Sequence, residues 1–155
     1  MQSLAALLDG ETDPISVMST ISCELHHAFA HFHWVGFYRL VDERTLKVGP
    51  YQGTHGCLTI DLARGVCGKC ARESRVQIEN DVSKIPHHLA CSGETKSEIV
   101  LPVLDPSGNI RAVLDIDAIE LDSFDETDEK YLKMICAYVY AGKASSAKEP
   151  ENTHG

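Results

Sequence analysis

The chain is poor in basic residues. Its 14 lysines and arginines stand against 23 aspartates and glutamates, which gives a formal charge of −9 at pH 7. No basic run or stripe offsets this excess, and a negatively charged chain repels the phosphate backbone of a nucleic acid. Nucleic-acid binding is therefore not expected.

Long hydrophobic runs are missing as well. The apolar stretch near the N-terminus ends at Leu8 and follows no positively charged segment. It is too short for the core of a signal peptide or for a membrane span. The last three residues form no address signal, so we expect a cytoplasmic protein without a membrane partner.

No internal repeat and no linker-like segment divides the 155 residues, of which 43% are hydrophobic. A chain of this size can bury a core without metal or disulfide staples. We expect one domain over residues 1–143, followed by a disordered polar tail over 144–155. Without an export signal, the six cysteines favour a catalytic or metal-binding use over a secreted disulfide framework.

The pattern of apolar residues predicts an α+β fold. A helix is expected to begin at Asp13-Pro14 and to reach Phe29, and a last helix to begin near 123–126 and to reach Gly142. We expect an antiparallel sheet with helices on one face and active-site loops over the other. The expected strands are 34–40, 45–49, 57–61, 76–79, 98–104 and 110–119, with a short helix within 65–74.

Three carboxyl groups are expected to gather on one face of this sheet. Strand alternation places Asp115 and Asp117 on the same face. A five-residue hairpin loop would pair Glu98 with Ile116, a four-residue loop would pair it with Asp115 or Asp117, and in every register those two acids are its neighbours. The plainer alternative is a solvated sheet face. Because facing like charges destabilise a sheet, a ligand cation or a proton on one carboxyl explains the patch better.

Cys67 lies between glycines in the segment GVCGKC, before a lysine and at an expected helix N-terminus. Each of these features favours a thiolate. With Cys70 it forms a Cys-x-x-Cys pair, which leaves open a thioredoxin-like redox pair or half of a zinc site. The remaining zinc ligands would be Cys91 with His87 or His88.

The other cysteines differ in their surroundings. Cys23 and Cys136 fall within the expected helices and are interpreted as small buried apolar residues. Cys57 and Cys91 instead lie in polar, glycine-containing loop sequence, where chemistry often resides. Together with Cys67 they are the candidate reactive thiols.

Several short segments, in one order, carry a resemblance to a known family. Over roughly Asp13 to Val139 the chain resembles the free methionine-R-sulfoxide reductases, enzymes built on a GAF domain. The resemblance implies a GAF-like fold and a thiol-dependent oxidoreductase that needs no cofactor. The segments are WVGFY (34–38), GPYQG (49–53), the cysteine before LTI (57), GVCG (65–68), HLAC (88–91), SEIVLPV (97–103) and VLDID (113–117).

The resemblance also implies roles for the thiols. Cys91 is the nucleophile that attacks the sulfoxide sulfur, which leaves a sulfenic acid on the enzyme. Cys57 is the first choice for the resolving cysteine and Cys67 the second. An external dithiol, thioredoxin or an equivalent, then reduces the disulfide. Nothing in the sequence demands a homodimer, although one through the terminal helices is compatible with it.

For the pocket, the resemblance implies that Glu98, Asp115 and Asp117 bind and protonate the sulfoxide and hold the substrate's ammonium group. A carboxyl whose pKa is raised by its neighbours is a suitable proton donor for the departing oxygen. Trp34 and Tyr38, four residues apart on one face of a strand, would line an apolar wall for the ε-methyl group.

Two other functions stay open. A GAF domain can be a sensor that binds a small ligand without chemistry, although three spaced cysteines are unnecessary for that purpose. The alternative is a zinc-binding protein that uses Cys67, Cys70, Cys91 and a histidine.

Overall fold

The computed structural model describes residues 2–86, 88 and 91–141. Its strands form one six-stranded sheet in the order β3-β2-β1-β6-β5-β4, and each neighbouring pair is antiparallel. The tail expected over 144–155 lies outside the described residues, and the domain limits 1–143 stay a prediction. In chain order the elements are α1 (Gln2–Leu8), α2 (Pro14–Ala28), β1 (Phe32–Leu40), β2 (Thr45–Gly53), β3 (Thr59–Asp61), α3 (Gly65–Glu73), β4 (Gln77–Glu79), η1 (Val82–Lys84), β5 (Ser97–Leu104), β6 (Ile110–Ala118) and α4 (Glu126–Cys136).

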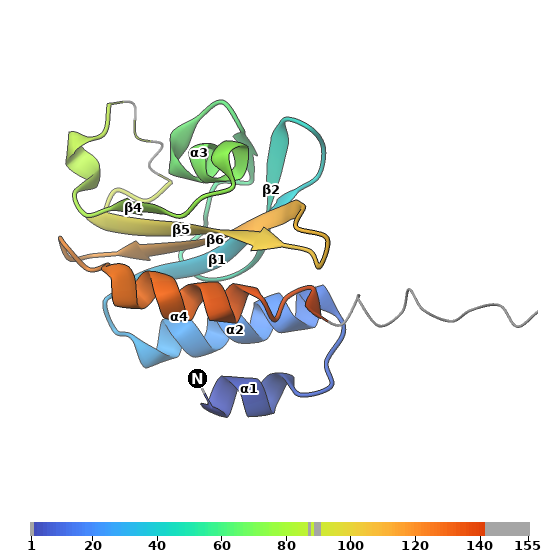
Figure 1. Ribbon diagram of the computed structural model, residues 1–155. Helices are drawn as coiled ribbons and strands as arrows, with labels where there is room; N and C mark the ends of the chain where they lie inside the picture. The colour runs from blue at the N-terminus through green and yellow to red at the C-terminus, as the bar shows by residue number, and fades with distance from the viewer. Residues whose placement is uncertain (1, 87, 89–90, 142–155) are drawn as a thin grey trace, which may run out of the picture.

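The sheet separates two layers. Figure 1 shows α2 and α4 packed against one face, with α1 beyond them, while α3 and the long connections lie over the other face. This arrangement confirms the expected α+β architecture. Each face of the sheet has its own apolar cluster, and the larger one lies under the helices. Its fully buried members include Val17, Met18, Ile21, Val35, Phe37, Ile99, Leu101, Val103, Leu114 and Ile116.

The helix starts follow from local hydrogen bonds. Asp13 caps α2 and accepts a hydrogen bond from the Ile15 amide, and Pro14 occupies the first turn. Asp125 caps α4 in a reciprocal arrangement, because its carboxylate accepts from the Asp128 amide while the Asp128 carboxylate accepts from the Asp125 amide.

The end of α4 differs from the sequence prediction. The helix stops at Cys136 rather than reaching Gly142. The following amides bond three residues back, Tyr138 to the Ile135 carbonyl and Val139 to the Cys136 carbonyl, so the chain tightens into turns after the helix. Tyr140 and Val139 remain buried against the large cluster, so these turns still cover the sheet.

The short helix α1 and the single turn η1 were not expected from the sequence. With seven residues, α1 is too short to be stable on its own. Leu4 and Leu8 are buried in the large apolar cluster, so tertiary packing maintains the helix. Among the described residues, no helix has the length and apolar character needed to span a membrane.

A bulge in the β5–β6 hairpin decides which residues face each other. The loop has five residues, and Leu104 pairs with Ile110 as expected for that length, but Val103 then pairs with Ala112. The extra residue on β6 shifts every later pair by one position. As a result Glu98 faces Asp117, and the expected pairing of Glu98 with Ile116 in a five-residue loop is wrong.

Gly36 allows the aromatic side chains of β1 to close over the sheet. The rings of Trp34 and Tyr38 stack with centroids 5.6 Å apart, and Tyr51 stacks on Trp34 at 5.3 Å. A Cβ atom on Gly36 would lie 2.5 Å from Trp34 Cη2 and 2.4 Å from Tyr51 Cβ. The aromatic wall that Trp34 and Tyr38 form therefore requires glycine at position 36, between them.

We expect Gly36→Ala to lower the free energy of unfolding by about 2 kcal/mol, since the added methyl group overpacks a buried site. Tryptophan emission should also change, because Trp34 is the single tryptophan of the chain. Denaturant unfolding monitored by fluorescence measures both effects. Gly93→Ala is the matched control, because a Cβ atom there meets nothing within 4 Å. Equal stability of the two variants would contradict the packing argument.

Candidate active site

A pocket lies between the N-terminal half of α3, residues 88 and 91–95, and the face of the sheet opposite α2 and α4. The free space within it is about 480 Å³ when the open solvent at its mouth is included, and the centre of a water molecule can reach about 30 Å³ of it, so the enclosed part is narrow. Seven of the eight site residues expected from the sequence line it, and Cys57 is joined to it through Cys91. The lining residues are Trp34, Tyr38, His55, Gly56, Ile60, Arg64, Gly65, Val66, Cys67, His88, Cys91, Ser92, Thr95, Glu98, Asp115 and Asp117.

Cys57 and Cys91 form a disulfide at the edge of this pocket. Their Cα atoms are 5.4 Å apart although 34 positions separate them in the sequence. Both residues are partly exposed, so a reductant can approach the bond. Of the two partners expected for Cys91, the structure pairs it with Cys57, while Cys67 is a free thiol.

The three acids meet at the floor of the pocket. Glu98 on β5 faces Asp117 on β6, and Asp115 lies two residues earlier on the same face. Glu98 and Asp115 are each 6% exposed. Burial is the main cause that raises the pKa of both groups well above their ordinary values, and the neighbouring carboxylates add to it. Burial and the neighbouring acids therefore favour the protonated forms of both groups.

Asp117 differs from the other two acids. Burial raises its pKa to about 6, while hydrogen bonds from Glu98 and Asp115 and the nearby His88 act in the opposite direction. His88 Nε2 lies 3.4 Å from Glu98 Oε2, and both side chains are nearly enclosed. Among the described residues, Asp115 Oδ1 and Asp117 Oδ1 are buried without a hydrogen-bond partner, so the patch has acceptor capacity for a ligand.

The structure corrects the expectation of a thiolate at Cys67. The residue does lie in the first turn of α3, between Gly65 and Gly68. Its side chain is buried against the acids, and burial, followed by the charges of Asp115 and Glu98, raises the pKa of the thiol. Desolvation and two carboxylates outweigh the helix N-terminus, so Cys67 is held protonated.

The zinc site considered from the sequence is not assembled. Cys91 is bonded to Cys57, and Cys70, a residue of α3, is buried and does not line the pocket. His87 lies outside the described residues. In the described part of the chain, one set of three side chains of metal-ligating type has all its ligand atoms within 4.8 Å of one another. It consists of Cys67, Glu98 and Asp115.

The remaining cysteines are partly as expected. Cys136 is buried in the large apolar cluster, and burial raises its pKa to about 12. Cys23, which lies within α2, is less buried than expected, and its Sγ atom is 3.7 Å from His27 Nδ1. Neither lines the pocket.

The aromatic wall is as expected. Trp34 and Tyr38 are each 2% exposed and line the pocket. The Trp34 indole donates a hydrogen bond of 2.8 Å to the Thr54 carbonyl, which fixes the ring. Burial, together with the charge of Asp115, raises the pKa of the Tyr38 phenol, so this side chain stays neutral.

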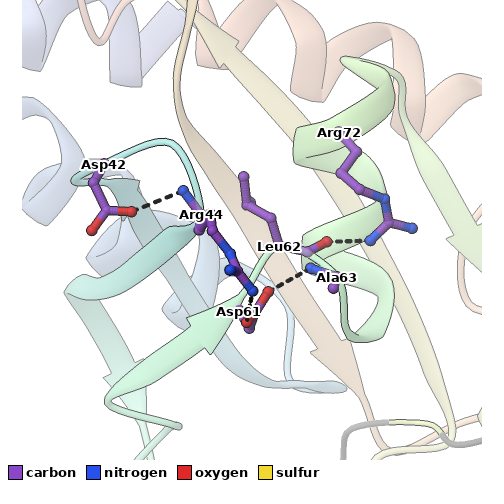
Figure 2. A network of polar contacts seen from close by, with 6 residues as sticks. All are labelled: Asp42, Arg44, Asp61, Leu62, Ala63 and Arg72. Carbon is purple, nitrogen blue, oxygen red and sulfur yellow. Dashed lines mark hydrogen bonds and ion pairs between the residues drawn. The ribbon is translucent and has the colours of Figure 1, made fainter.

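A polar network fixes the turn that leads into α3. Asp61 accepts hydrogen bonds from the Ala63 amide at 2.8 Å and from the Arg44 guanidinium at 3.4 Å, and the Arg72 guanidinium donates to the Leu62 carbonyl (Figure 2). Asp42 in turn accepts from the Arg44 amide at 2.8 Å. The network holds β3 against the start of α3, and so sets the position of the residues that follow the turn.

Sequence reasoning gave no role in the reaction to five polar residues that line the pocket, namely His55, Arg64, His88, Ser92 and Thr95. His88 was weighed only as a zinc ligand, although it lies beside Glu98. Arg64 was not considered, yet it lines the pocket immediately before α3. The only sequence signal for Arg64 is its place directly before the GVCG segment.

Fold and site together define a small α+β domain with an oxidised cysteine pair beside an acidic ligand pocket. A family model described as "GAF domain" matches residues 11–140, and the chain belongs to the GAF-domain family, among relatives that include free methionine-R-sulfoxide reductases. The GAF-like fold and the family resemblance predicted from the sequence are thus confirmed.

The individual relatives cover most of the chain. "GAF domain-containing protein A" of Dictyostelium discoideum is 44% identical over 87% of this chain and 84% of its own length. The "Free methionine-R-sulfoxide reductase" of Saccharomyces cerevisiae is 37% identical over 88% of this chain and 79% of its own length. A solved structure of free methionine-R-sulfoxide reductase from Neisseria meningitidis in complex with its substrate is 36% identical, covers 92% of this chain and 86% of that chain, and superposes with a TM-score of 0.84.

We expect Asp117→Asn to stabilise the protein at neutral pH. Because its pKa in the folded chain is about 6, the contribution of Asp117 to stability is complete below about pH 4 and is lost as the pH rises through 6. The side-chain amide of the variant does not ionise, so the variant does not lose this stability as the pH rises. Its free energy of unfolding should exceed that of the parent chain by about 3 kcal/mol at pH 7.5 and differ little at pH 4.

Denaturant unfolding at the two pH values measures this difference. The control is Glu120→Gln, which changes an exposed carboxylate just beyond β6 and should leave stability unchanged at both pH values. A difference between Asp117→Asn and the parent chain that does not grow from pH 4 to pH 7.5 would contradict the raised pKa.

Proposed function

We propose that this chain reduces free L-methionine-R-sulfoxide to methionine through a cysteine sulfenic acid and an intramolecular disulfide. One observation carries the proposal: the Cys57–Cys91 disulfide lies at a pocket whose floor holds three protonatable acids, of which Glu98 and Asp115 are buried and Asp117 is partly buried. A sulfoxide reductase needs these two features together. The relatives named free methionine-R-sulfoxide reductase support the same activity.

In the first step the Cys91 sulfur attacks the sulfoxide sulfur. A bond forms between the two sulfur atoms, and the protonated sulfoxide oxygen leaves as water. Water then attacks the Cys91 sulfur, the bond between the two sulfurs breaks, and methionine and a Cys91 sulfenic acid are formed while one proton returns to the acids. The sulfoxide sulfur is reduced by two electrons, and the Cys91 sulfur is oxidised by two. Cys91 lines the pocket, so the attacked atom can lie within it.

The acids supply the proton that this step requires. The departing oxygen becomes a good leaving group only when it is protonated, and a raised pKa favours the protonated form of a carboxyl group, which can donate that proton. Glu98 and Asp115 meet this condition. Asp117, whose pKa is about 6, is the most readily ionised of the three and is suited to face the substrate's ammonium group.

In the second step the Cys57 thiol attacks the Cys91 sulfenic acid. The S–O bond breaks, a disulfide forms, and the hydroxyl group leaves with the thiol proton as water. The oxidised chain described above is the product of this step. An external dithiol, thioredoxin or a functional equivalent, then exchanges with the partly exposed disulfide and restores both thiols.

The pocket walls select the substrate. The stacked rings of Trp34 and Tyr38 offer an apolar surface for the methyl group on sulfur. A chiral pocket with this wall on one side and the acids on another presents the proton donors to the oxygen of one epimer. The cytoplasmic location, the reductant and a homodimer stay predictions.

A sensor function is the second candidate. A GAF sensor would bind its ligand in the same pocket and leave it unchanged, without any need for a disulfide. The redox pair therefore favours the enzyme. A chain that binds methionine sulfoxide but forms no methionine in the presence of a dithiol would establish the sensor instead.

We expect Cys91→Ser to abolish turnover, because an alcohol does not replace the thiol in either step. Cys57→Ser should still form about one methionine per chain in a single turnover and accumulate the Cys91 sulfenic acid, which a dimedone-type probe traps. Steady-state reduction by thioredoxin should fall at least 100-fold in this variant.

Cys23→Ser is the matched control, since Cys23 lies on α2 and does not line the pocket. It should keep the activity of the parent chain. Full activity of Cys91→Ser would show that another thiol is the nucleophile.

The substrate profile tests the pocket independently of the thiols. We expect turnover of free L-methionine-R-sulfoxide, with at least 100-fold lower kcat/KM for the S epimer and for sulfoxide within a peptide. Chromatographic measurement of methionine formed from each compound gives these ratios. Comparable rates with an internal methionine sulfoxide of a peptide would contradict a pocket built for one amino acid.

A further inference from the structure

Three side chains of different origin meet at one point of the pocket. Cys67 comes from α3, Glu98 from β5 and Asp115 from β6. One ligand-type atom of each lies within 4.8 Å of the other two, and all three residues are buried and line the pocket. Together they offer a sulfur and two carboxylate oxygens, which are donors that zinc takes in proteins.

Asp115 gives an independent indication of a bound group. Its exposed fraction is 6%, so it is more than nine-tenths buried, and its Oδ1 atom has no hydrogen-bond partner among the described residues. A buried acceptor without a donor costs free energy, and so do neighbouring carboxylates without a positive charge. A cation bound between Asp115 and Glu98 removes both costs.

The space at this point has the size of a single ion. The centre of a water molecule can reach about 30 Å³ of the pocket, which is room for one or two waters or a small cation. The ligand atoms around a tetrahedral zinc ion are about 3.5 Å apart, because zinc–oxygen and zinc–sulfur bonds are about 2.1 and 2.3 Å long. Donor atoms within 4.8 Å of one another therefore close around zinc with side-chain shifts of about 1 Å or less.

The donor set favours zinc over the other common dications. Ca²⁺ and Mg²⁺ take oxygen ligands, whereas a thiolate suits zinc. Three protein ligands leave a fourth position open, and His88 Nε2, 3.4 Å from Glu98 Oε2, is a nitrogen donor beside it. This set shares Cys67 with the zinc site considered from the sequence, but it uses neither Cys70 nor Cys91.

We propose that Cys67, Glu98 and Asp115 bind a zinc ion, and that bound zinc inhibits the reductase by occupying the acidic end of its pocket. The zinc site rests on the geometry alone, whereas the inhibition rests on the proposed function. Zinc holds both carboxylates, which then donate no proton to a sulfoxide, so zinc and substrate exclude each other. Cys67, which takes no part in the two proposed steps, is the ligand that the reaction does not need.

The binding experiment uses the oxidised full chain, because its Cys57–Cys91 disulfide provides no thiolate ligand. Equilibrium dialysis should give about one zinc ion per chain, and Co²⁺ in its place should show the near-ultraviolet absorption of a thiolate-bound ion. Cys67→Ser should lose this absorption and bind zinc roughly 100-fold more weakly. Glu98→Gln keeps the thiol and the side-chain shape, so it should keep the absorption and bind about 10-fold more weakly.

Cys23→Ser is the matched control, because Cys23 is a free thiol that lies beside His27 and does not line the pocket. It should bind zinc as the parent chain does. A parent chain without stoichiometric zinc would overturn the site. So would a Cys67→Ser or a Glu98→Gln variant whose affinity for zinc equals that of the parent chain.

A single-turnover measurement tests the inhibition separately. The reduced chain, freed of reductant, is mixed with L-methionine-R-sulfoxide, with and without zinc at about ten times the Kd of the parent chain. Methionine formation should slow at least about 5-fold in the parent chain and in Cys23→Ser. In Cys67→Ser it should slow less than about 2-fold relative to the same variant without zinc.

The outcomes separate this proposal from the proposed function. A parent chain that binds zinc but is not slowed would overturn the inhibition. Equal slowing of Cys67→Ser would overturn it as well, because the zinc would then act through Cys57 and Cys91. A chain that binds zinc through Cys67 but never forms methionine supports the zinc site and contradicts the proposed function.

Discussion

The structure depends on keeping three carboxyl groups together in a place that water hardly reaches. Burial and mutual repulsion both favour the protonated forms, so the patch is stable only when it holds protons or a ligand. Two of its oxygens have no partner among the described residues. The same arrangement that weakens the fold at neutral pH thus supplies proton donors and acceptors to whatever enters the pocket.

The fold places this costly patch on one face of the sheet and its main source of stability on the other. Beneath the sheet, α1, α2 and α4 enclose a continuous apolar cluster that includes fully buried residues from β1, β5 and β6. Because neighbouring residues of a strand point to opposite faces, Leu114 and Ile116 belong to that cluster while Asp115 and Asp117 line the pocket. Packing on the helix side therefore holds the acids in position.

Local signals in the sequence were sufficient for the strands, the start of α2, the shared face of Asp115 and Asp117, and the aromatic wall. They were insufficient where tertiary packing decides. The bulge that sets Glu98 opposite Asp117 is a property of the paired hairpin, and α1 is maintained by contacts outside itself. The protonation state of Cys67 differs from the expected thiolate for the same reason. The helix N-terminus is visible in the sequence, whereas folding brings the acids to the thiol and buries it.

That difference explains how one pocket with two nearby thiols can direct the sulfenic acid to a single partner. Cys67 is buried beside Asp115 and Glu98, and burial, followed by any negative charge on these acids, raises the pKa of its thiol. The sulfur therefore stays protonated, and a protonated thiol is a poor nucleophile. Cys57 lies outside the acidic floor and is partly exposed. In the proposed reaction the acids therefore do more than protonate the sulfoxide. They also suppress Cys67 as a competitor, which leaves Cys57 to form the bond with Cys91 that the oxidised chain contains.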